Sequence, residues 1–180
     1  MVDVAVVVVA AGRGSRAGGD LPKQFRAIGG APMVRQSLAM FVDHPKVGSV
    51  QPVIHPDDVA MFQSSASGLD VLPPVFGGAT RQSSVRAGLE AIAARNPDIV
   101  LIHDAARPFA SPQLVARAIE AAARTGAAIP TLPVTDTVKT VDAQGMVDNT
   151  LDRNVLRLVQ TPQSCTFADL LDAHRRAARA

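Results

Sequence analysis

VAVVVVAAGRGSRAGGDLPKQF, residues 4–25, is the stretch of the chain that most clearly indicates the fold. It begins as an unbroken apolar run from Val4 to Ala11, rich in β-branched valine and without alternating polar residues. Strands in the middle of a parallel sheet are buried on both faces and have this composition. The run therefore predicts a central strand of a parallel sheet.

The loop after this run has the composition of a phosphate site. It carries four glycines and three cations: Gly12, Gly14, Gly18, Gly19, Arg13, Arg16 and Lys23. Glycine lets backbone N–H groups approach a ligand closely, and phosphate oxygens are what such groups usually bind. A buried strand that leads into a cationic, glycine-rich loop indicates a nucleotide site.

Two common nucleotide fingerprints fit this loop poorly. Gly12-x-Gly14-x-x-Ala17 matches the dinucleotide pattern, but Gly18 and Pro22 would break the helix that the pattern requires. No acidic residue lies about 20 residues further on to bind a ribose hydroxyl, and the Walker pattern is absent. The longer string A-A-G-x-G-x-R…P-K-Q is a more specific signal than the glycines alone.

Length and composition favour one cytoplasmic globular domain over residues 1–180. The chain is 47% hydrophobic and 19% charged, which is ordinary for a globular protein. Its net charge is +2 and its arginines are scattered, so we expect no nucleic-acid partner. The single Cys165 forms no intrachain disulfide, and a catalytic thiol is the less favoured interpretation because no His is near it in sequence. The N-terminal apolar run is too short to span a membrane, so we expect no membrane contact.

Helix and strand patterns alternate along the chain, which predicts an α/β fold with a mostly parallel sheet and helices on both faces. The expected strands are Val47–Ile54, Val71–Phe76, Ile99–Ile102 and Ala127–Val134. The expected helices are Pro32–Val42, a helix with an apolar face at Val85, Leu89 and Ile92, and a helix from Ser111 to Gly126. Pro52 argues against a central, fully paired position for its strand. Thr166 to Asp169 has the pattern of a capping box that opens the last helix.

Two later loops could bind ligands. Residues 77–84, GGATRQSS, place Arg81 and hydroxyls before a helix. They fit a plain helix cap and an anion site equally well. His103 and Asp104 end a buried strand, where α/β sheets bind ligands, although Asp104 could instead only cap the turn or pair with Arg107.

The segment from Thr137 to Leu151 predicts a β-hairpin around the turn at Asp142 to Gly145. Its polar content indicates that the hairpin projects from the core. We therefore expect a β-arm over about residues 135–153.

The motifs together resemble one family. A-A-G-x-G-x-R…P-K-Q, G-G-x-x-R-x-x-S, H-D-A-A-R-P, D-T-x-K, D-R and T-P-Q follow one another in the order seen in methylerythritol-phosphate cytidylyltransferases. The match extends from residue 4 to about residue 171, and H-D-A-A-R-P with P-K-Q is its most specific part. The resemblance implies a Rossmann-like nucleotidyltransferase fold and cytidylyl transfer from CTP to 2-C-methyl-D-erythritol 4-phosphate.

The resemblance also implies roles for particular residues. The expected catalytic, charge-stabilising residues are Arg16 and Lys23. The expected nucleotide-binding residues are Ala10, Ala11, Gly12, Arg13, Gly14, Lys23, Gly78, Arg81, Ser84 and Ala105. The expected substrate-binding residues are Asp104, Thr137 and Arg153, with Asp104 also beside Mg²⁺ or another divalent cation.

Assembly and chain length follow from the same resemblance. The family's arm crosses into the partner subunit, which implies a homodimer. Family chains usually continue beyond the equivalent of Ala180, so the sequence fits a fragment or part of a longer fusion with the next pathway enzyme. The alternatives are a cytidylyltransferase for another alditol phosphate, such as ribitol phosphate, and a non-catalytic nucleotide-binding module or NAD-type enzyme.

Overall fold

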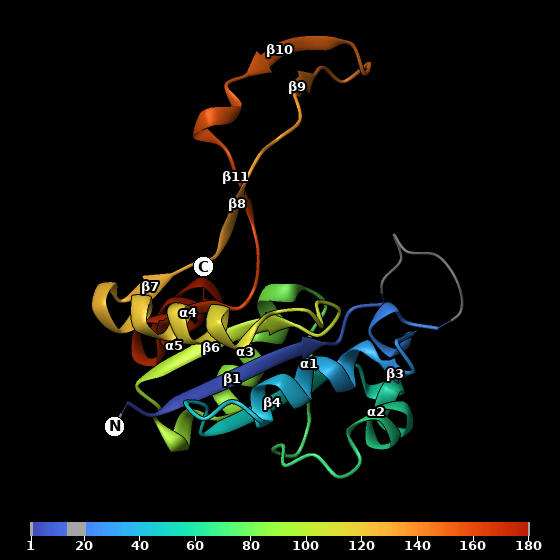
Figure 1. The fold of residues 1–180 in the computed structure, drawn as a ribbon, viewed down its shortest axis with the longest axis vertical. Coiled ribbons are helices and arrows are strands. Elements are labelled where there is room, and N and C mark those ends of the chain that lie inside the picture. The colour runs from blue at the N-terminus through green and yellow to red at the C-terminus, as the bar shows by residue number, and fades with distance from the viewer. Residues whose placement is uncertain (1, 14–20, 180) are drawn as a thin grey trace.

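The computed structural model describes residues 2–13 and 21–179. Its body is a sheet with the strand order β5-β4-β1-β6-β12-β7, and a long arm extends from one end of that body (Figure 1). The sheet strands are β1 (Val4–Ala10), β4 (Ser49–Ile54), β5 (Val75–Phe76), β6 (Ile99–Asp104), β7 (Ala127–Ala128) and β12 (Gln163–Thr166). A small ribbon of β2 (Ala27–Ile28) and β3 (Ala31–Pro32) lies beside it.

Strand β1 is the centre of the sheet, as its apolar run predicts. It pairs in parallel with β4, from Ala5 opposite Ser49 onward, and with β6, from Val4 opposite Ile99 onward. β5 is also parallel, whereas β12 runs antiparallel between β6 and β7. The mostly parallel α/β sheet is therefore confirmed.

The prediction from Pro52 is confirmed in part, because β4 is an inner strand but is not fully paired at this proline. In β4, Pro52 is in register with Val8 of β1. The outer neighbour β5 pairs only with Val53 and Ile54, so the proline is next to a stretch of β4 without a strand on its other side. The predicted strand over residues 71–76 is shortened to its last two residues, since Pro73 and Pro74 cannot donate ladder hydrogen bonds.

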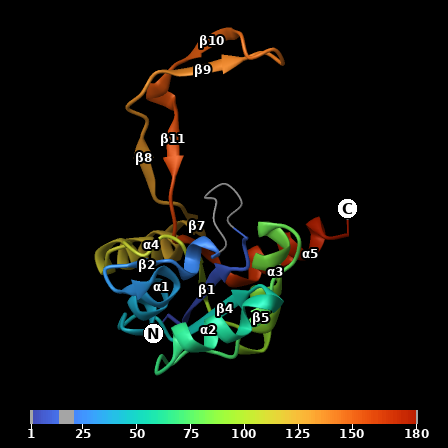
Figure 2. The same ribbon diagram turned by 90° about the vertical axis from the view of Figure 1, so that its right-hand side faces the viewer.

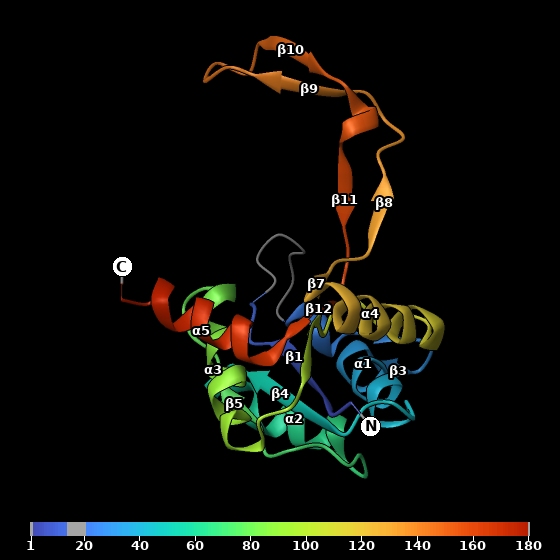
Figure 3. The same cartoon turned by 90° about the vertical axis from the view of Figure 1, so that its left-hand side faces the viewer.

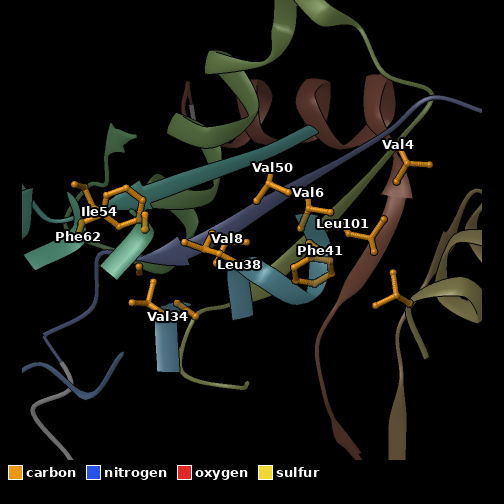
Figure 4. Packing of buried hydrophobic residues seen from close by; sticks show 14 of the residues in the cluster. Val4, Val6, Val8, Val34, Leu38, Phe41, Val50, Ile54, Phe62 and Leu101 are labelled. Atoms are coloured by element: carbon orange, nitrogen blue, oxygen red, sulfur yellow. The ribbon is translucent and has the colours of Figure 1, made fainter. Parts of the chain in front are cut away.

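Helices cover both faces of the sheet, as predicted. Those on one face are α1 (Met33–Val42), α2 (Val59–Ala66) and α4 (Pro112–Thr125), and those on the other are α3 (Arg81–Ala91) and α5 (Phe167–Ala177). Figure 4 shows the first core, where Val6 and Val8 of β1 pack near Leu38 and Phe41 of α1. Each such buried side chain contributes about 1.5–3 kcal/mol.

Individual residues determine where α4 begins and ends and how closely α3 approaches β1. The Ser111 hydroxyl caps α4 by accepting from the Leu114 N–H, and Gly126 ends the helix with a φ of 83°. A Cβ at Gly88 would lie 2.4 Å from Val7, so glycine lets α3 approach β1. The capping box predicted at Thr166 does not form, because the Thr166 hydroxyl bonds to the Asp169 carboxylate instead of a backbone N–H.

The arm has two parts. A stalk of β8 (Thr131–Pro133) and β11 (Arg157–Val159) carries an outer ribbon of β9 (Val138–Val141) and β10 (Val147–Leu151), and η5 (Arg153–Val155) lies between β10 and β11. In Figures 1, 2 and 3 the arm stands clear of the body. The strand predicted over residues 127–134 is split, because the chain leaves the sheet at Ile129 and Pro130. The predicted hairpin is confirmed.

The helices of the described segments include none that is long and apolar enough to cross a lipid bilayer.

Candidate active site

A cleft of about 560 Å³ opens at the carboxyl ends of β1 and β6. Five segments line it: the end of β1 with the turn after it, the 3₁₀ turn η2 (Lys23–Phe25), His55 after β4, the loop before α3, and the end of β6 with the residues after it. Parallel strands bring their carboxyl ends to one edge of a sheet, which is why segments far apart in sequence meet here.

Gln24 holds the first wall of this cleft in place. Its side-chain amide donates to the Ala10 carbonyl at 2.7 Å and to the Gly12 carbonyl at 3.0 Å, and only 4% of the residue is exposed. Lys23 therefore sits at a fixed point of the backbone beside the end of β1. An added Cβ at Gly12 would meet no atom within 4 Å, so the open space belongs to the cleft. The sequence analysis missed the role of Gln24, although P-K-Q was its signal.

The loop before α3 is a true helix cap. The Thr80 hydroxyl accepts from the Ser83 N–H, and the Ser83 side chain bonds back to Thr80. The buried Ser84 hydroxyl accepts from the Gly78 N–H at 3.2 Å and donates to the Thr80 carbonyl at 2.9 Å. The hydroxyls thus shape the loop, and Arg81 is the group of this loop that brings charge to the cleft.

Asp104 is paired on both oxygens. Its Oδ1 lies 3.0 Å from Arg81 Nε and its Oδ2 lies 3.4 Å from Arg107 Nε, with 32% of the side chain exposed. The pairing with Arg107 that the sequence left open is confirmed, and Arg81 is a second partner. Asp104 is the one acidic residue among the described residues that line the cleft.

Arg13 lines the cleft but its charge is already offset. Its guanidinium bonds to Asp57 at 2.8 Å, to Asp58 at 3.0 Å and also to His55. The Asp58 side chain is fully buried, and its Oδ2 has no partner. Arg13 therefore ties the turn after β1 to the start of α2, which limits what it can offer a phosphate.

His103 points away from the cleft into the first core. Its ring meets Phe41 edge to face, with centroids 4.9 Å apart. Burial lowers the pKa of His103 to about 4, so the imidazole is neutral near pH 7. Of the His-Asp pair, only Asp104 reaches the cleft.

A second hollow of about 850 Å³ continues from the cleft toward the root of the arm. It shares Lys23, Asp104 and Ala106 with the cleft, and its further polar lining includes Arg107 and Thr161. Neither residue was expected to line the site, although the motifs H-D-A-A-R-P and T-P-Q contain them.

The structure brings most of the expected site residues together. Those that line the cleft are Ala10, Ala11, Gly12, Arg13, Lys23, Gly78, Arg81, Ser84, Asp104 and Ala105. Gly14 and Arg16 lie outside the described residues. Thr137 and Arg153 are exposed on the arm, where Arg153 donates to the Thr135 carbonyl, and they line neither hollow of their own chain.

Sequence comparison identifies relatives over nearly the whole chain. The profile of the IspD family, described as 2-C-methyl-D-erythritol 4-phosphate cytidylyltransferase, matches residues 4–180. The bifunctional enzymes IspD/IspF of Nitrobacter hamburgensis and of Rhodopseudomonas palustris strain HaA2 are each 60% identical over 175 residues. These matches cover 97% of this chain but 43% and 44% of the relatives, so the chain spans less than half of their length.

Solved structures show the same fold. The 2-C-methyl-D-erythritol 4-phosphate cytidylyltransferase of Thermus thermophilus is 40% identical with a TM-score of 0.74, and the match covers 98% of this chain and 77% of that one. The 4-diphosphocytidyl-2C-methyl-D-erythritol synthase of Anaerococcus prevotii is 27% identical with a TM-score of 0.86, covering 99% and 76%. The expected nucleotidyltransferase fold is confirmed.

Proposed function

This chain belongs to the family of 2-C-methyl-D-erythritol 4-phosphate cytidylyltransferases, and from that premise we propose that it transfers the cytidylyl group of CTP to 2-C-methyl-D-erythritol 4-phosphate. An acceptor phosphate oxygen attacks the α-phosphorus of CTP, the bond to the β-phosphate oxygen breaks, and pyrophosphate leaves with the electron pair. The products are 4-diphosphocytidyl-2-C-methyl-D-erythritol and pyrophosphate. No general base is needed, because a phosphate monoester is largely ionised near pH 7.

The observation that carries this proposal is the junction of the two hollows at Lys23 and Asp104. The cleft with Gly12, Gly78 and Ser84 would take the nucleotide, and the hollow with Arg107 would take the acceptor phosphate. Lys23 would then face the α-phosphate, where negative charge develops in the transition state. Catalysis of phosphoryl transfer depends mostly on such positioning and charge stabilisation. By resemblance, Arg16 would be the second stabilising cation.

We also propose that Mg²⁺ or another divalent cation accompanies the triphosphate and neutralises part of its charge. Across residues 2–13 and 21–179 no cluster of three His, Cys, Asp or Glu residues could hold a metal by itself. Mg²⁺ commonly takes one carboxylate together with substrate phosphates, and Asp104 would supply that carboxylate. Since both of its oxygens face arginines, Asp104 would have to release one of them.

The arm fits a homodimer with shared sites. Thr137 and Arg153 lie too far out on the arm to line either hollow of their own chain, whereas a two-fold pair could bring them to the partner's second hollow, where the acceptor would lie. Their proposed role is to bind the acceptor phosphate there. A cytoplasmic location belongs to the same proposal, since the chain contains a single cysteine and uses an intracellular nucleotide.

Pyrophosphate release by the purified protein tests the reaction. We expect release with CTP, Mg²⁺ and 2-C-methyl-D-erythritol 4-phosphate, and little with ribitol phosphate as the matched acceptor. Release only with ribitol phosphate would reassign the acceptor, and release with neither would favour a non-catalytic nucleotide-binding module.

Ligand-induced stabilisation tests the nucleotide separately. CTP with Mg²⁺ should raise the Tm more than ATP, GTP or NAD, because a ligand that binds only the folded state stabilises it by mass action. A larger shift with NAD would contradict the assignment of the cleft.

A further inference from the structure

Two segments far apart in sequence meet at the root of the arm. One is the end of β6 with the loop after it, which carry Asp104 and Arg107, and the other is the loop between β11 and β12, which carries Gln160 and Thr161. The Arg107 guanidinium donates to the Gln160 side chain at 2.6 Å, and the Asp104 N–H approaches the Thr161 hydroxyl at 3.5 Å. Both segments line the hollow assigned above to the acceptor.

His103 lies between these two segments and touches both. Its Nε2 lies 3.0 Å from the Arg107 carbonyl, and its Nδ1 lies 3.1 Å from the Thr161 hydroxyl oxygen. The residue is fully buried, and the edge-to-face contact with Phe41 fixes its ring plane. Burying a neutral imidazole costs little free energy when both nitrogens are hydrogen-bonded. Without these bonds, folding would pay the desolvation free energy of each nitrogen.

The hydrogen-bond partners determine which nitrogen carries the proton. The Arg107 carbonyl can only accept, so Nε2 is the protonated nitrogen and donates to it. Nδ1 then accepts the single proton of the Thr161 hydroxyl, whose oxygen remains available to the Asp104 N–H. One tautomer satisfies every group, and it holds both segments in one arrangement.

We propose that His103 is a positioning residue for the acceptor side of the site, fixing the Asp104–Arg107 loop against the root of the arm. His103 does not line either hollow, so it acts through Arg107, Thr161 and Asp104. The nucleotide side is held by other contacts, namely the hydrogen bonds from Gln24 of η2 to the end of β1 and the cap of α3. The inference rests on the proposed function, because it takes the hollow near the arm as the acceptor's.

The kinetic test is His103→Phe, which keeps an aromatic ring against Phe41 and removes both hydrogen bonds. We expect the KM for the acceptor to rise about 10-fold or more and the KM for CTP to stay within about twofold, since only the acceptor side is misplaced. Thr161→Val, which removes one hydroxyl, should show the same split with a smaller rise. Thr161→Ser keeps the hydroxyl and should restore the wild-type values.

The matched control is Ser164→Ala on β12. Ser164 is buried, and its hydroxyl donates to the Ala118 and Ala128 carbonyls at 2.9 and 3.1 Å, away from the Asp104 loop. This variant loses buried hydrogen bonds close by, so it should lower the Tm without changing the acceptor KM. A rise in acceptor KM in Ser164→Ala equal to that in His103→Phe, or an equal rise for CTP and acceptor in His103→Phe, would overturn the proposal.

Amide hydrogen exchange separates this inference from the proposed function. In His103→Phe, residues 104–107 and 157–161 should exchange faster than in wild type, while the β1–β4 pair should be unchanged. Wild-type protein without any pyrophosphate release would refute the proposed function alone. Unchanged exchange in both segments of His103→Phe would refute the positioning role, whatever the activity.

Discussion

The body and the arm of this molecule use apolar residues in opposite ways. In the body, five helices of the described chain cover the two faces of the sheet, and the valines of β1 pack in two separate cores. In the arm, Met146 and Val155 are 68% and 77% exposed, and the paired strands cover little of one another. The body therefore buries its apolar side chains within its own core, whereas the arm leaves these two side chains largely exposed.

The two regions also hold different parts of the proposed site. In the body, hydrogen bonds of the neighbouring Gln24 hold the backbone at Lys23, and two ion pairs hold Asp104. Thr137 and Arg153, in contrast, are positioned only by the two-stranded ribbons of the arm. An isolated two-stranded ribbon is marginal in water. The proposed homodimer would therefore place the charge-stabilising groups on the body and leave the arm to be positioned by docking on the partner. Four experiments test this comparison.

The first tests the body. Lys23→Ala should lower kcat by about 10²-fold or more with little change in Tm, because the side chain is exposed at the junction of the two hollows. Steady-state pyrophosphate release measures it. Lys46→Ala is the matched control, since Lys46 is also a surface cation but pairs with Glu120 far from the cleft. Full kcat in Lys23→Ala would make Lys23 a surface residue only.

The second experiment tests how the buried His103 makes the stability of the body depend on pH. In the unfolded chain His103 takes up a proton as the pH falls through about 6.5, but the folded protein resists this until about pH 4 because burial lowers the pKa. The contribution of this group to stability should therefore be complete above pH 6.5 and fall by roughly 2–3 kcal/mol by pH 4.5.

Urea unfolding at pH 7, 5.5 and 4.5 measures that loss. His103→Phe should show a shallower dependence on pH over this range, whatever its stability at pH 7. Equal slopes for the variant and the wild type would show that His103 titrates normally in the folded protein.

The third tests the arm as part of another chain's site. Lys23→Ala and Arg153→Ala homodimers should each be nearly inactive, whereas equal mixing with subunit exchange should restore about one quarter of wild-type activity. Half of the dimers are then mixed, and each has one intact site. Mixed dimers confirmed by mass but without recovered activity would exclude shared sites.

The fourth, with the smallest effect, tests what the exposed apolar surface of the arm does. Met146→Ser should raise the dimer Kd about 10-fold by removing roughly 1.4 kcal/mol of buried apolar contact. Val2→Ser, an exposed apolar residue of the body, should leave the Kd unchanged. Sedimentation velocity over a concentration series measures both. An unchanged Kd for Met146→Ser would place this side chain outside the interface.

Strong local patterns in the sequence led to correct predictions. The valine run, the caps of α4 and the turn at Asp142 each act over a few residues, so their physics is visible in the chain itself. Predictions that depended on a neighbour were wrong or incomplete. Pro52 is tolerated in an inner strand because β5 is short, and Thr166 bonds to Asp169 rather than capping its helix.

The central parallel strand, the projecting hairpin and the family were all predictable from the amino-acid sequence alone. The family resemblance supplied ten of the residues that line the cleft, although the role of Gln24 was not expected. The hydrogen-bond and ion-pair partners of the charged side chains became visible only in the folded structure. Arg13 is offset by two aspartates from a distant turn, Asp104 is shared between two arginines, and His103 bonds to both segments at the root of the arm. Four of these pairings join residues 23 to 58 positions apart, and the two pairings with Arg107 cross the turn after β6. Hydrogen bonds and ion pairs depend on distance in space, which a linear pattern does not contain.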